Sequence, residues 1–121
     1  MAKITEQMFD AAYETGKKLH AHSISYTESI RILEVQYGMN PHSADDYVYA
    51  YINMADGKAL KRTISNTAMR YYLTKFFEDQ GKVRLQTALS AIQKTIDYRV
   101  ASDIGSVASL RQIHNSFLVK L

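Results

Sequence analysis

The amino-acid sequence predicts an all-α protein, a compact bundle of five to six amphipathic helices. Apolar residues recur at spacings of three and four along most of the 121-residue chain, which is the period of a helix with one buried face. Gly38, Gly57 and Gly81 each follow such a stretch, as a glycine at a helix C-terminus does. No convincing pair of strands is present. We expect a single helical domain over residues 1–121.

The first two helices are expected over residues 5–19 and 25–37. Inside the first lies Gly16, and glycine weakens a helix by about 1 kcal/mol relative to alanine. We therefore expect the end of this helix to fray. The second helix opens with a capping box, because Ser25 and Glu28 are three residues apart and each can satisfy the other's backbone donor.

The third helix is expected over residues 41–56. Asn40 is a favoured N-cap residue, and the proline that follows it suits the first helical position. Tyr47, Tyr49 and Tyr51 alternate with apolar residues, a pattern that a buried strand also shows. We favour the helix because the cap is strong and no partner strand is in sight. Three tyrosines cover more than one helix face, so at least one should reach the surface or a partner.

Three further helices are expected over residues 65–80, 82–101 and 104–118, with Gly81 separating the first from the second. Each has one apolar stripe at helical spacing. The last two are long enough to pack antiparallel in a bundle.

The net charge of +3 is unevenly distributed. Residues 1–57 hold four basic and eight acidic residues, whereas residues 58–121 hold eleven basic and four acidic residues. Such an asymmetry favours a face that attracts a polyanion, or two halves that attract each other. The alternative is a solvated basic face without a function.

Several classes of protein are excluded or disfavoured. The chain has no cysteine, which excludes disulfides and thiolate chemistry and fits a cytoplasmic protein. No apolar run approaches the ~18 residues of a membrane-spanning helix. His20 and His22 lack a third ligand at a recognisable spacing, so we expect no metal site. No phosphate-binding loop, dinucleotide fingerprint or nucleophile elbow is present, so we expect no cofactor and no catalytic residues.

Residues 58–84 are the better candidate for contact with nucleic acid. Basic side chains, which suit phosphates, interleave there with aromatic side chains, which suit unstacked bases. The helix that starts at Ser65 would offer backbone donors to a phosphate as well. The alternative is that the aromatic residues are core, above all Tyr72 and Phe76, and that the cations only decorate the outside. The residues expected to contact DNA here are Lys58, Lys61, Arg62, Arg70, Tyr71 and Lys75.

Residues 27–52 form a possible helix-turn-helix, because two helices of suitable length flank a short turn that contains glycine. The first turn of the second helix would then face base edges in a major groove. Asp45 and Asp46 argue against this reading, since carboxylates repel phosphates, and a purely structural helical hairpin is the alternative. The residues that would read bases are Asn40, His42 and Ser43.

Four segments of the chain are distinctive: Tyr37-Gly38-Met39-Asn40, Ser43-Ala44-Asp45-Asp46-Tyr47, Lys61-Arg62-Thr63 with Ser65-Asn66, and Arg70-Tyr71-Tyr72-Leu73. Together they resemble a helical module found ahead of the nuclease domain in bacterial HNH-type restriction endonuclease-like proteins. The resemblance covers roughly residues 1–100. It implies DNA recognition in bacterial defence, with Lys61, Arg62 and Arg70 as phosphate contacts. The nuclease domain and its metal-binding histidines are absent, so we expect this chain not to cut DNA.

The sequence therefore predicts a non-catalytic DNA-binding module associated with a restriction-type HNH nuclease. The expected partners are DNA and an HNH nuclease domain or partner protein, and no membrane. The alternative is a protein-interaction or homodimerisation module. That alternative is favoured by the nine tyrosines, by the charge asymmetry and by the apolar residues within 117–121.

Overall fold

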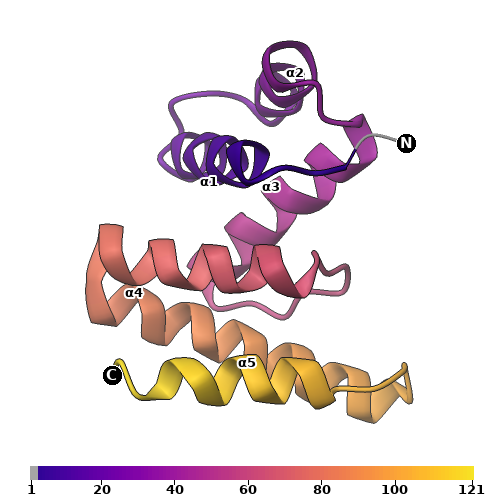
Figure 1. Ribbon diagram of the computed structural model, residues 1–121, viewed down its shortest axis with the longest axis vertical. Coiled ribbons are helices and arrows are strands. Elements are labelled where there is room, and N and C mark those ends of the chain that lie inside the picture. Colours follow the sequence, from indigo (N-terminus) through magenta and orange to yellow (C-terminus); the bar gives the residue numbers. More distant parts are fainter. Residues whose placement is uncertain (1–2) are drawn as a thin grey trace. The chain divides into compact units, whose positions relative to one another are not determined.

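The computed structural model describes residues 3–121 and confirms the all-α class, because these residues form five helices and no strand (Figure 1). The helices are α1 (Glu6–His20), α2 (Tyr26–Tyr37), α3 (Pro41–Asp56), α4 (Asn66–Ser102) and α5 (Ala108–Leu118). The chain divides into two compact units, the N-terminal unit (Met1–Ile52) and the C-terminal unit (Asn53–Leu121). The single domain expected over residues 1–121 stays a prediction.

The helix starts of the N-terminal unit follow from local capping. The hydroxyl of Thr5 accepts from the Met8 amide at 3.2 Å and caps α1. The predicted capping box of α2 is confirmed, with Ser25 Oγ and Glu28 Oε1 accepting from each other's amides at 3.1 and 3.3 Å. The Asn40 side chain accepts from the His42 amide at 2.9 Å ahead of α3. Each bond satisfies a donor that the first helical turn leaves unpaired.

Gly16 marks a close approach between α1 and α3. The residue is buried, and a Cβ atom added to it would lie 2.6 Å from Cγ of Tyr51. Helix α1 continues past Gly16 to His20, and fraying of its end stays a prediction. The absence of a side chain lets the two helices pack, and this tertiary contact overrides the low helix propensity of glycine.

The tyrosine-rich segment is a helix, as predicted, and not a strand. Tyr47 and Tyr51 are buried, whereas Tyr49 between them is partly exposed. The Tyr47 ring stacks on Phe9 with 5.9 Å between centroids, and the Tyr51 ring meets Tyr13 edge-on at 5.2 Å. These aromatic contacts join α1 to α3 in the core of the N-terminal unit.

In the C-terminal unit, Gly81 divides α4 into two arms. Its φ of 87° and ψ of −176° are not helical, and the chain reverses there, so residues 66–80 form a first arm and residues 82–102 a second arm (Figure 1). This division confirms the prediction that Gly81 separates two helices. Helix α5 packs on α4 and lies along the second arm. The buried apolar residues of this packing include Leu85, Leu89, Ile92, Ile96, Leu110, Ile113 and Phe117.

The start of α5 differs from the sequence expectation. The helix begins at Ala108 and not at Ile104. Asp103 and Gly105 have φ values of 53° and 60°, so the chain leaves the right-handed helical conformation twice between the two helices. None of the helices within residues 3–121 is both long and apolar enough to cross a membrane.

Candidate nucleic-acid interface

Three of the predicted DNA contacts lie in the segment of residues 57–65, which we call the basic loop. The loop begins directly after α3 at Gly57, whose φ is 69°. The amides of residues 57 and 58 there donate to the carbonyls of residues 54 and 53 at 3.3 and 2.8 Å, which is a Schellman motif. The loop ends at Ser65, whose hydroxyl caps α4. Its three basic side chains, all exposed, are Lys58, Lys61 and Arg62.

The backbone of the basic loop is bonded to the second arm of α4. The amide of Leu60 donates to Oγ1 of Thr95 at 2.8 Å, and both residues are buried. The Thr95 hydroxyl in turn donates to the Ala91 carbonyl at 2.8 Å. A loop amide is thus satisfied inside the core by a side chain 35 residues further along the chain, so the middle of the loop has a fixed position.

Three basic residues of the second arm form hydrogen bonds with the loop and with the end of α3. Each donates a hydrogen bond, and the pairs are Arg84 to the Ala55 carbonyl at 2.7 Å, Lys94 to the Gly57 carbonyl at 2.8 Å, and Arg99 to Thr63 Oγ1 at 3.3 Å. Two of these cations bind carbonyls at a helix C-terminus, where the helix dipole favours positive charge. Sequence reasoning missed this positioning role, because the bonded residues are 29 to 37 positions apart.

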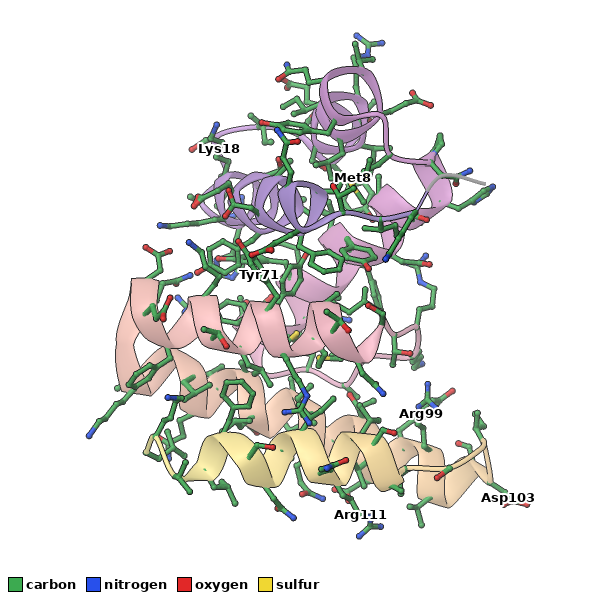
Figure 2. All side chains as sticks on the ribbon, viewed as in Figure 1. Met8, Lys18, Tyr71, Arg99, Asp103 and Arg111 are labelled. Atoms are coloured by element: carbon green, nitrogen blue, oxygen red, sulfur yellow. The ribbon has the colours of Figure 1, made fainter. Side chains whose placement is uncertain are left out.

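Lys61 also lies against an aromatic ring of the second arm. Its ammonium nitrogen is 5.9 Å from the centroid of the Tyr98 ring, which is within the range of a cation–π contact. Tyr98 is partly exposed. Figure 2 shows the next residue, Arg99, at the same end of the second arm as Asp103. Sequence reasoning did not single out Tyr98, because nothing within its own helix distinguishes it.

The other predicted contacts of this unit are on the first arm. Arg70, Tyr71 and Lys75 are each partly exposed. The Arg70 guanidinium donates to Ser116 Oγ of α5 at 3.3 Å, so this cation contacts α5, whereas the basic loop is bonded to the second arm. Tyr72 and Phe76 are fully buried with their rings edge-to-face at 6.5 Å, which confirms that these two aromatics are core residues.

The remaining candidates are at the start of α3 in the N-terminal unit. Asn40 and His42 are exposed and Ser43 is partly exposed. Asn40 and Ser43 line an open pocket of about 730 Å³, together with Lys3 and Glu34 among others. The turn between α2 and α3 is short, as a helix-turn-helix requires. The Tyr26 hydroxyl of α2 also donates to the Asp45 carboxylate of α3.

Within residues 3–121, no group of three histidine, aspartate or glutamate side chains is arranged to hold a metal ion. His20 packs against the Tyr51 ring, with 6.3 Å between the ring centroids.

In our comparisons with known proteins, no family model, curated protein or solved structure matched this chain. The class of molecule is therefore defined by fold and surface alone: a small all-α protein with a basic loop bonded to a helical hairpin.

Proposed function

We propose that this protein is a non-catalytic DNA-binding module and that the basic loop is its main contact with phosphates. The observation that carries the proposal is the exposure of Lys58, Lys61 and Arg62 on a loop with a bonded backbone. Cations that displace counterions from phosphates supply most of the affinity of such contacts. A loop that is already ordered loses little further conformational entropy when it binds.

The distribution of charge between the units supports this assignment. The C-terminal unit holds eleven basic and five acidic residues, a net charge of +6, whereas the N-terminal unit holds four and seven, a net charge of −3. A polyanion is attracted to the C-terminal unit and repelled by the N-terminal unit. Asp45 and Asp46 follow Ser43 closely in the chain, and Glu34 lines the same pocket as Asn40 and Ser43. These carboxylates repel phosphates, so the proposal that Asn40, His42 and Ser43 read bases is the weaker part.

The test is a fluorescence-anisotropy titration with labelled DNA across a series of salt concentrations. We expect the double variant Lys61→Glu/Arg62→Glu to bind at least about 10-fold more weakly, whatever the DNA sequence. The slope of log K against log salt should fall by about 2, because two phosphate contacts are lost.

The matched control is Arg111→Glu/Lys120→Glu, which makes the same change in net charge outside residues 58–84. Both control residues are exposed, and Figure 2 shows Arg111 on the side of α5 away from α4. We expect a much smaller loss of affinity. Equal losses in the two double variants would mean that only net charge matters, and no binding by the unaltered protein at low salt would discard DNA binding.

The resemblance to modules ahead of HNH nucleases adds a second element to the proposal, a role beside a restriction-type nuclease. We expect supercoiled DNA to remain uncut when it is incubated with this chain and Mg²⁺. Nicking that persists through purification and disappears in Lys61→Glu/Arg62→Glu would show that the chain itself cuts DNA.

A protein-interaction or homodimerisation module is the second candidate. It is favoured by three exposed apolar side chains near the end of the C-terminal unit, Leu118, Val119 and Leu121, which are 45%, 86% and 45% exposed. Light scattering should then give a dimer mass that returns to a monomer mass when all three are replaced by serine. A monomer at the highest soluble concentration would count heavily against this function.

A further inference from the structure

We infer that the basic loop takes single-stranded DNA in preference to duplex DNA, with Tyr98 as the surface on which one base stacks. This inference rests on the proposed function and names the form of DNA that the same site selects. It follows from the position of the loop on the second arm of α4.

Two hydrogen bonds align the loop with one turn of the second arm. The Leu60 amide binds Thr95 at 2.8 Å, and Arg99 binds Thr63 at 3.3 Å. Residues 60–63 therefore run beside residues 95–99. Lys61 lies between these two bonds, and its ammonium nitrogen is 5.9 Å from the Tyr98 centroid.

This juxtaposition pairs the two groups that single-stranded nucleic acid requires. A tyrosine face stacks on any base, and a neighbouring cation neutralises the phosphate of that nucleotide. Stacking of a base is generally stronger than an exposed cation–π contact. A base can therefore replace the Lys61 ammonium over the Tyr98 ring, and the ammonium then binds the adjacent phosphate.

The neighbouring charges are compatible with a phosphate at this place. Arg62 is exposed and follows Lys61 directly. The nearest carboxylate along the helix, Asp97, accepts a hydrogen bond from Gln93 at 3.0 Å on its own helix. Consecutive helical side chains diverge by about 100°, so this carboxylate points away from the direction of Tyr98.

Duplex DNA cannot use the Tyr98 surface in this way, because its bases are stacked on one another and hidden from the ring. The cations of the basic loop still attract a duplex through its phosphates. The structure thus assigns two separable contributions to the loop, a charge contribution common to both forms and a stacking contribution for single strands only.

The test compares a labelled single-stranded 12-mer with the matching duplex at one salt concentration. We expect the unaltered protein to prefer the single strand. In Tyr98→Leu the affinity for the single strand should fall by about 5-fold to 50-fold, whereas the affinity for duplex changes by less than about 2-fold. Tyr98→Phe keeps the ring and should retain the preference.

A second readout uses the absence of tryptophan from the chain. In Tyr98→Trp the only indole lies at the proposed stacking position, and a stacked base should quench its fluorescence on titration with single-stranded DNA. The matched control is Tyr37→Trp, also at a partly exposed tyrosine but in the N-terminal unit, where no quenching is expected. This readout remains decisive if Tyr98→Leu fails to fold.

Failure of this inference is distinguishable from failure of the proposed function. An unquenched Tyr98→Trp, or a Tyr98→Leu variant that keeps the single-strand preference, overturns the stacking role. DNA binding through the loop then still stands if Lys61→Glu/Arg62→Glu weakens both forms of DNA. If that double variant binds both forms as well as the unaltered protein does, the assignment of the basic loop as the main phosphate contact is wrong too, and if the unaltered protein binds neither form, the DNA-binding function is wrong.

Discussion

At the scale of single residues, local propensity and tertiary packing act in opposite directions at Gly16. An alanine there would favour the helix by about 1 kcal/mol. Its Cβ would, however, lie 2.6 and 2.8 Å from Cγ and Cβ of Tyr51. These two atoms are at the base of the tyrosine side chain, so the contact can be relieved only if α1 and α3 move apart.

We therefore expect Gly16→Ala to lower the free energy of unfolding by about 2 kcal/mol, as overpacking of a core does. Urea denaturation followed by circular dichroism measures this loss. The comparison variant is Gly38→Ala, because Gly38 has a φ of 72° and open space around its Cβ position. It should lose about 1 kcal/mol from backbone strain alone. A Gly16→Ala protein more stable than the unaltered protein would contradict the close approach.

Thr95 is a second residue whose role depends on a distant partner. In Thr95→Val the buried Leu60 amide loses its acceptor, which should lower the free energy of unfolding by about 1–3 kcal/mol. Thr74→Val is the matched control, because Thr74 donates to the carbonyl four residues earlier, as Thr95 does, and no loop amide is known to depend on it. Equal stabilities of the two variants would show that the loop amide finds another partner.

At the scale of elements, α4 is a hairpin of two arms and not one long rod. An uninterrupted helix would place residues 67 and 102 about 50 Å apart. The contact of Arg99 with Thr63 requires the arms to lie side by side. We expect spin labels at Thr67→Cys and Ser102→Cys to be separated by less than about 25 Å. The chain has no native cysteine, so both labels are unambiguous, and a separation near the rod value would refute the hairpin.

Most helix ends were predictable because their signals are local. The Ser25–Glu28 box, the Asn40 cap and Gly81 each act within four residues. The start of α5 was not predictable, because it depends on Asp103 adopting a left-handed conformation, which is rare outside glycine.

The candidate site was predictable only in part. The exposed cations of the basic loop follow from charge and apolar patterning along the chain. Tyr98 and the bonded cations Arg84, Lys94 and Arg99 do not, since each acts on a residue at least 29 positions away. Periodicity identifies which residues are buried or exposed, but it does not identify which helix lies beside a loop.

At the scale of the whole molecule, the two units share one helix. Residues Pro41 to Ile52 of α3 belong to the N-terminal unit, and the rest of the helix belongs to the C-terminal unit. Tyr51 is buried in the first part and Met54 in the second. Helix formation is cooperative, so loss of either unit removes support from a helix that the other unit also uses.

We therefore expect a single urea transition when circular dichroism and tyrosine fluorescence are recorded on the same samples. The two curves should coincide, as for one cooperative unit. Two separated transitions would mean that the units unfold independently and that α3 can lose one end while it keeps the other.

The bond between Leu60 and Thr95 has a consequence for the dynamics of the loop. Amides outside regular helices usually exchange their protons with solvent quickly, because only local fluctuations protect them. The Leu60 proton is enclosed with its acceptor in the core, so its release requires the second arm to separate from the loop. In deuterated solvent this loop proton should persist as long as those of the buried helical turns around Ile92 and Ile96. Its exchange would report the separation of the loop from the second arm, from a position where no helix exists.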